Sequence, residues 1–155
     1  MLANGVFEIK NTFKVSPEEL VGQMTYLIDT QVLLWLLFSP EHISKKGFSI
    51  IKNTNQNLLV SQVSLWEIPL KYSIGKLKLI KYKQEDIIAT TQEMNGSILE
   101  FTNEHLLKYC QRRKTIHKDP FDRFLIWQAL SLDVPIISKD KSFNLYKPDG
   151  LNTIW

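Results

Sequence analysis

The sequence has little cysteine and no long apolar run, and each absence excludes a class of protein. Its 155 residues include one cysteine, which excludes a disulfide framework within the chain and a cysteine-rich zinc site. The longest uninterrupted apolar run, Val32–Phe38, is far shorter than the roughly 20 residues that a membrane-spanning helix needs. The first 20 residues contain three glutamates and no apolar block, unlike a secretory signal. We therefore expect a soluble, cytoplasmic protein that does not bind membranes.

A large net charge is also missing. The chain has 19 Lys and Arg against 16 Asp and Glu, a net charge of +3, which is too small to attract a polyanion through the overall field. Two local stretches, Lys71–Lys83 and Lys108–Lys118, each contain five cations and no acid. Each stretch is either a surface that binds a polyanion or an ordinary solvated face. The apolar content of 44% with 23% charged residues excludes a disordered chain.

From Met24 onward, short apolar segments alternate with longer amphipathic ones. We predict strands at residues 26–28, 57–60, 97–101, 134–138 and 153–155. We predict helices at residues 32–38, 43–51, 65–74, 84–94, 102–113 and 119–130. Short, continuously apolar strands separated by helices indicate a parallel sheet that is covered on both faces. The predicted fold class is α/β, with four or five parallel strands flanked by helices. Residues 24–155 form one domain in this interpretation, and residues 1–23 are a short appendage or the result of a misplaced start codon.

Carboxylates follow the predicted strands at the edge where ligands bind in an open parallel sheet. Asp29 comes directly after the first strand, and Glu67 lies at the entry to the helix after the second. Asp122 is in the first turn of the helix that leads to the strand at 134–138, and Asp140 follows that strand. We therefore expect these four acids to gather at one edge of the sheet.

Carboxylates that share a site repel one another unless a positive charge lies among them. Lys139 and Arg123, the cations nearest in sequence, cannot neutralise all four acids. A hard divalent cation can, and a site of oxygen ligands alone favours Mg²⁺ or Mn²⁺. Such ions activate water and hold the oxygens of a phosphodiester during its hydrolysis. The pattern of acids with basic flanking stretches therefore indicates a nuclease.

Four segments of the chain resemble the PIN-domain family, and within it the VapC toxins of bacterial type II toxin–antitoxin pairs. They are Tyr26–Trp35, Val60–Glu67, Asp119–Ile126 and Ile136–Asp140. The resemblance covers roughly residues 24–155 and implies a three-layer fold. It also implies an Mg²⁺-dependent endoribonuclease, with Mn²⁺ as a substitute, that cleaves RNA by means of metal-activated water. Members of this group are usually homodimers, and a cognate antitoxin holds them inactive.

The same resemblance implies a role for individual residues. The catalytic and metal-binding acids are Asp29, Glu67, Asp122 and Asp140. The hydroxyl groups of Thr30 and Ser138 support these acids, and Asp119 lies just outside them. The chain departs from the family in two places: it has Gln31 where relatives often carry histidine, and Pro69 where relatives have small residues. These departures leave open a second function, a catalytically silent PIN fold that binds RNA or protein.

Several of these residues also have a purely structural interpretation. Asp29 is suited to cap the following helix, and Ser64 with Glu67 forms a capping-box pattern. Asp119 precedes Pro120 and therefore sits where a helix N-cap belongs. Trp35, Trp66 and Trp127 are most simply residues of the core or of a dimer interface. For RNA binding, we predict the cations that lead into the Asp122 helix, namely Arg112, Arg113, Lys114 and Lys118.

Overall fold

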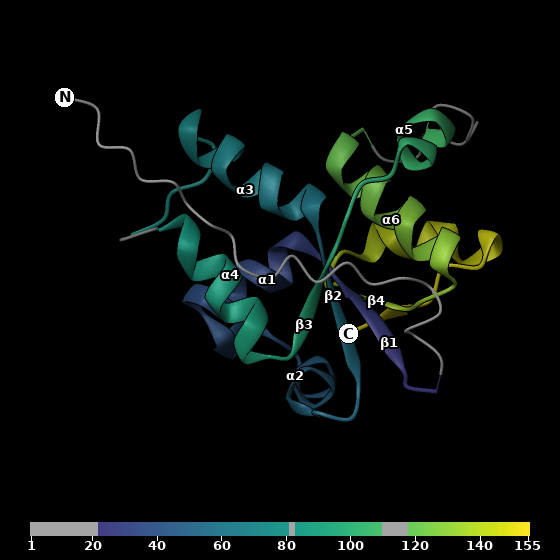
Figure 1. Cartoon of the computed structure of the whole chain (residues 1–155), viewed down its shortest axis with the longest axis horizontal. Coiled ribbons are helices and arrows are strands. Elements are labelled where there is room, and N and C mark those ends of the chain that lie inside the picture. The colour runs from purple at the N-terminus through teal and green to yellow at the C-terminus, as the bar shows by residue number, and fades with distance from the viewer. Residues whose placement is uncertain (1–21, 81–82, 110–117) are drawn as a thin grey trace.

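The computed structural model describes residues 22–80, 83–109 and 118–155. Within them, five strands form one parallel sheet in the order β3-β2-β1-β4-β5 (Figure 1). The strands are β1 (Thr25–Ile28), β2 (Asn57–Ser61), β3 (Gly96–Leu99), β4 (Ile136–Ile137) and β5 (Thr153–Ile154). β1 is central, and its Leu27 pairs in register with Leu59 of β2 and Ile136 of β4. The predicted α/β fold with a parallel sheet is therefore confirmed.

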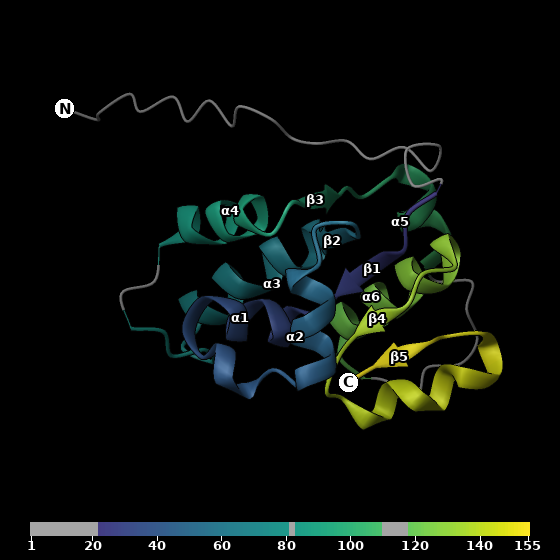
Figure 2. The ribbon, with the colours of Figure 1, turned by 90° about the horizontal axis from the view of Figure 1, so that it is seen from below.

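Helices cover both faces of the sheet. The α-helices of the described residues are α1 (Thr30–Phe38), α2 (Lys45–Lys52), α3 (Gln62–Ser73), α4 (Gln84–Glu93), α5 (Asn103–Tyr109) and α6 (Pro120–Leu132). Two 3₁₀ helices, η2 (Pro40–His42) and η3 (Lys141–Asp149), complete them. Figure 1 shows the sheet between α1 and α4 on one side and α6 on the other. Figure 2 shows the same layers from below, with the yellow helix η3 beside the edge strand β5.

The core consists of two apolar clusters, one on each face of the sheet. Tyr26 and Ile28 of β1 pack with Val32 of α1 in the first cluster. Leu27, which points to the opposite face, packs with Leu125 of α6 in the second. Burying both faces explains why the strands are continuously apolar rather than alternating. It also fixes α1 and α6 relative to β1, from which the site is built.

One difference from the predicted elements that bears on the site is at α3, which begins at Gln62 rather than Leu65. Ser61 is its N-cap, and the backbone N–H of Val63 donates to the Ser61 hydroxyl at 3.0 Å. Pro69 lies inside this helix, where a proline costs up to about 3 kcal/mol because it has no N–H. The helix continues because its N-terminus is capped and Ile68, next to the proline, is completely buried.

Other differences from the predicted elements lie near the C-terminus. The strand predicted at 134–138 is reduced to Ile136–Ile137, and the 3₁₀ helix at Lys141–Asp149 was not predicted. The predicted N-terminal appendage lies outside the described residues except for its last two positions. The end of the helix predicted at 102–113 lies outside them as well. In the part of the chain that the structure describes, no helix is long and apolar enough to cross a bilayer.

Candidate active site

A cavity of about 480 Å³ lies where β1 and β4 end, beside the starts of α1 and α6 and the central turns of α3. It brings together all four acids that the sequence predicts as a site, together with Asp119. The carboxylates that line it belong to Asp29, Glu67, Asp119, Asp122 and Asp140. The expected gathering of acids at the carboxyl edge of the sheet is therefore present.

Asp29 is held in a fixed orientation at the end of β1. It is the N-cap of α1, and the backbone N–H of Gln31 donates to its Oδ1 at 3.5 Å. The Ser138 hydroxyl donates to its Oδ2 at 2.6 Å, and both side chains are buried. Burial raises the pKa of Asp29 to about 6, although the hydrogen bonds from Ser138 and Gln31 lower it. Asp29 therefore has the capping role that the sequence suggested, and it also lines the cavity.

Glu67 lies in the middle of α3 with only 5% of its surface exposed. Its Oε1 accepts a hydrogen bond from the Lys71 ammonium, while its Oε2 has no partner among the described residues. The capping-box interpretation of Glu67 is wrong, because Ser61 caps the helix. Ser64 instead shares a buried hydrogen bond of 2.8 Å with the hydroxyl of Thr30, which joins α3 to α1. Glu67 is thus a buried acid with an oxygen that lacks a donor, which is costly unless a cation or a proton is near.

Lys71 is a site residue that the sequence analysis missed. Its Nζ donates to Glu67 and lies 3.2 Å from Asp119 Oδ2, and it is 5.6 Å from the centre of the Phe121 ring. Burial lowers the pKa of Lys71, but the hydrogen bond and charge of Glu67, followed by those of Asp119, raise it overall. The sequence analysis considered only Lys139 and Arg123 as counter-charges, whereas the cation that contacts two of the acids is Lys71. The four-residue spacing of Glu67 and Lys71 on one helix face was the available signal.

Two acids come from the start of α6. Asp119 is the N-cap, because Phe121 N–H donates to its Oδ1 at 2.9 Å, and Pro120 occupies the first helical position. This confirms its structural interpretation. Asp122, in the first turn, has a pKa raised to about 7 by burial and then by the negative charges of Asp119, Asp29 and Glu67, although Lys71 lowers it.

Asp140 differs from the other acids because its side chain is exposed and already used in a turn. Its Oδ1 accepts a hydrogen bond of 2.8 Å from Ser142 N–H, which makes it the N-cap of η3. Its own N–H donates to the Ser138 hydroxyl at 3.0 Å. Ser138 therefore links the backbone at Asp140 to the carboxylate of Asp29. The metal-binding role that the resemblance implies for Asp140 stays a prediction.

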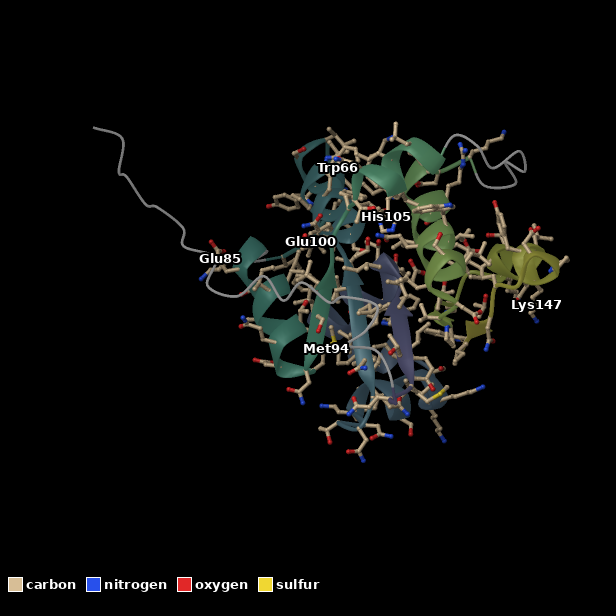
Figure 3. The ribbon with its side chains drawn as sticks, turned by 45° about the vertical axis from the view of Figure 1, so that its right-hand side comes forward. Trp66, Glu85, Met94, Glu100, His105 and Lys147 are labelled. Atoms are coloured by element: carbon tan, nitrogen blue, oxygen red, sulfur yellow. The ribbon has the colours of Figure 1, made fainter. Side chains whose placement is uncertain are left out.

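The predicted cations and tryptophans are placed as follows. Of the predicted RNA-binding residues, Arg112, Arg113 and Lys114 lie outside the described residues, and Lys118 is exposed just before Asp119. Trp127 is buried in the core, as expected. A core position is wrong for Trp66, which is 57% exposed and lies at the upper surface of the molecule in Figure 3.

The donor set of the cavity fits a hard divalent cation. It consists of oxygen atoms, it includes the unpartnered Oε2 of Glu67, and two of its carboxyl groups are difficult to ionise. A cation that binds there would relieve both the missing hydrogen bond and the mutual repulsion. Within the described residues, however, no three side chains of the His, Cys, Asp and Glu types are arranged as a ready-made ligand group. The carboxylates would have to close on the ion.

The fold and the cavity together define an α/β protein with a carboxylate site at the carboxyl edge of its parallel sheet. The sequence profile of the PIN domain matches residues 26–147. The chain therefore belongs to the PIN domain family, which confirms the resemblance. A comparison with curated protein sequences finds no match.

Solved structures with the same fold include a member of the VapBC family of toxin–antitoxin systems. VapBC2 from Rickettsia felis, solved with a promoter DNA fragment, is 16% identical, covers 84% of this chain and 98% of its own, and gives a TM-score of 0.57. VapBC-5 from Mycobacterium tuberculosis is 14% identical over 84% and 97%, with a TM-score of 0.54. FitAcB from Neisseria gonorrhoeae is 15% identical over 84% and 96%, with a TM-score of 0.53. Sequence identities of 14% to 16% show that these proteins share the fold with this chain, and nothing more specific.

Proposed function

We propose that this PIN-domain protein is a metal-dependent endoribonuclease and the toxin of a toxin–antitoxin pair. The observation that carries the proposal is the gathering of Asp29, Glu67 and Asp122 around one cavity, with an oxygen of Glu67 left without a donor. Burial and the neighbouring acids raise the pKa values of Asp29 and Asp122, so that both carboxyl groups favour a proton or a bound cation. The VapBC and FitAcB proteins that share the fold support the toxin assignment.

In this proposal Asp29, Glu67 and Asp122 hold Mg²⁺ or Mn²⁺, and Asp140 supports them from the rim of the cavity. The bound ion supplies charge neutralisation at the phosphodiester and lowers the pKa of the attacking water. Ser138 keeps Asp29 Oδ2 in place by its short hydrogen bond, while Asp29 Oδ1 accepts the N–H of Gln31 at the start of α1. The Thr30–Ser64 hydrogen bond sets the distance between the helices that carry Asp29 and Glu67. No side-chain nucleophile takes part.

The cations near the cavity are candidates for contacts with the RNA backbone. Lys76 and Lys139 line the cavity, and Lys118 is exposed beside Asp119. The stretch Lys108–Lys118, which carries Arg112 and Arg113, remains our proposal for further backbone contacts. Phosphates attract such side chains regardless of base sequence, so these residues provide affinity and not the choice of target.

A cognate antitoxin and a second copy of the chain are the proposed protein partners. The antitoxin proposal is supported by VapBC-5, a member of the VapBC family of toxin–antitoxin systems that shares the fold. The homodimer proposal is supported by large apolar side chains that are exposed on α3 and α5, at Trp66, Leu106 and Leu107. Large apolar side chains that are exposed on a folded chain are candidates for a protein interface.

Cleavage of RNA by the purified, antitoxin-free chain tests this function. With Mg²⁺ or Mn²⁺ we expect discrete fragments from a cellular RNA pool, and no fragments after EDTA is added. Asp122→Asn should lower the cleavage rate by at least about 100-fold, because it removes a charged ligand from the ion. Glu93→Gln, which changes an exposed acid of α4 away from the cavity, is the matched control and should cleave like the wild type. Cleavage that persists in EDTA would contradict the proposal.

One observation favours the alternative, a catalytically silent PIN fold that binds RNA or protein. Lys71 already forms ion pairs with Glu67 and Asp119 without a metal ion. A folded, antitoxin-free chain that binds RNA but cleaves none with either ion would support this alternative.

A further inference from the structure

One cation of the cavity, Lys71, is hydrogen-bonded to Glu67, the most buried of the proposed metal-binding acids. Lys71 Nζ donates to Oε1 of Glu67 and lies 3.2 Å from Oδ2 of Asp119. Glu67 thus has one oxygen held by an ammonium group and one oxygen with no partner among the described residues. One oxygen of this carboxylate is therefore available to a metal ion, and the other is occupied by Lys71.

The position of Lys71 follows from two elements that are fixed independently of it. Lys71 is four residues after Glu67 in α3, so both side chains project from the same helix face. Asp119 cannot turn away, because its Oδ1 caps α6 at the Phe121 N–H. The ammonium group therefore bridges α3 and α6 across the cavity, where the proposed ion would also have to bind.

The other described cations of the cavity are not placed in this way. Lys76 and Lys139 line it as well, but neither forms an ion pair with an acid among the described residues. The Lys139 ammonium lies 5.4 Å from the centre of the Trp35 ring instead. Among the described lysines of the cavity, the direct contact with Glu67 and Asp119 is specific to Lys71.

We propose that Lys71 is a built-in counter-ion that competes with the divalent metal ion for Glu67 and thereby sets the metal affinity of the site. The inference rests on the proposed metal site and goes beyond it by assigning a role to a residue that is not a ligand. Without metal, the ammonium group offsets the repulsion among the acids and keeps α3 beside α6. When a metal ion binds, the ammonium group leaves Glu67.

The side chain is suited to this exchange. Its exposed fraction is 32%, against 6% for the Glu67 side chain, so the ammonium group has a path to solvent while the carboxylate stays in place. The flexible four-carbon stem of lysine allows such a withdrawal, because the ammonium group is a compact and strongly hydrated charge. The energy of the broken ion pair is subtracted from the energy of metal binding.

Binding of Mn²⁺ to the full chain, followed by electron paramagnetic resonance and calorimetry, tests this role without any measurement of activity. Lys71→Met keeps much of the apolar stem and removes the charge. Lys71→Gln also removes the charge but keeps a polar group at the end of the side chain. We expect both variants to bind Mn²⁺ about tenfold more tightly than the wild type, as for the loss of one partly exposed, hydrogen-bonded ion pair. Mn²⁺ should also raise the melting temperature more in these variants than in the wild type.

Two further variants separate direct competition from a general change of charge. Lys71→Arg keeps the positive charge at this position and should bind Mn²⁺ no more tightly than the wild type, because the guanidinium group can hold the Glu67 carboxylate by two hydrogen bonds. Lys76→Met removes a different cation from the same cavity and should change the affinity by no more than about threefold, because exposed charges are screened.

The outcomes distinguish this inference from the proposed function. If Lys71→Met and Lys71→Gln, shown to be folded by circular dichroism, bind Mn²⁺ as weakly as the wild type or more weakly, Lys71 is not a competitor. In that case it orients Glu67 or only joins α3 to α6, and the metal site stands. If neither the wild type nor the Lys71 variants bind Mn²⁺, the metal site itself is wrong.

Discussion

Two carboxyl groups of the cavity, Asp29 and Asp122, hold their protons more tightly than an exposed aspartate does. Burial is the main cause in both, and neighbouring acids add to it. A carboxyl group in this state has a strong tendency to bind either a proton or a cation. The raised pKa values are therefore those expected of carboxyl groups in a metal site from which the ion is absent.

The pH dependence of stability follows from these two groups. Their pKa values rise from 3.8 to about 6 for Asp29 and about 7 for Asp122. Between about pH 4 and about pH 7 the folded chain therefore holds more protons than the unfolded chain, and its free energy of unfolding falls as the pH rises. Below about pH 4 the stabilisation from both groups is fully present. Urea unfolding in EDTA at several pH values measures the slope.

Substitution of Asp122 isolates its part of this slope. Asp122→Asn should flatten the fall between about pH 5 and about pH 7, because the amide does not ionise. Asp133→Asn, which changes an exposed acid at the end of α6, is the control and should leave the slope unchanged. A slope that is identical in all three proteins would show that Asp122 ionises normally.

At the scale of single residues, the sequence predicted which acids meet but not what holds them. Asp29, Glu67, Asp122 and Asp140 were predictable because each is placed relative to a strand or to the helix that leads into one. Lys71 was missed because one of its partners, Asp119, is 48 residues away in sequence. The contact depends on the packing of α3 on α6, which no local pattern contains.

At the scale of elements, α3 shows how a correct local rule can give a wrong boundary. Ser64 and Glu67 satisfy the capping-box pattern, but Ser61 ends β2 and caps the helix three residues earlier. Ser61 is preferred because its hydroxyl also donates to the buried Gln128 of α6 at 2.6 Å, a contact made by tertiary packing. Once the helix begins there, Glu67 moves from a capping position to the middle of α3 and faces the cavity.

The exposed apolar residues of α3 and α5 give a prediction at the same scale. Trp66 is 57% exposed and Leu107 is 74% exposed, which is costly in a monomer and favourable in an interface. We expect light scattering to give twice the 18.1 kDa of one chain. The double variant Trp66→Ser with Leu107→Ser should shift this mass to that of a monomer.

A change at an exposed aromatic residue elsewhere serves as the control for the dimer. Phe48 of α2 is 37% exposed, and Phe48→Ser should leave the dimer intact. A wild-type chain that is monomeric at micromolar concentration, or a double variant that remains dimeric, would show that this surface is not the interface.

At the scale of the whole molecule, the parallel sheet explains why distant segments share one site. Parallel strands end at the same edge of the sheet. The residues that follow β1 and β4 therefore meet there with residues of α3, which follows β2, and of α6, which precedes β4. The sequence predicted this parallel class from apolar strands separated by helices. The strand order β3-β2-β1-β4-β5 was not predictable in the same way, because it depends on which helix packs on which face.

The central claim is that the acids of this edge form a metal centre, and a crystal structure grown with Mn²⁺ tests it most directly. We expect an anomalous difference peak inside the cavity, with oxygen atoms of Asp29, Glu67 and Asp122 at about 2.0 to 2.3 Å from it. We also expect Lys71 Nζ to have moved away from Glu67. A map without a peak in the cavity at millimolar Mn²⁺, with Lys71 still bonded to Glu67 and Asp119, would show that these acids do not form a metal centre.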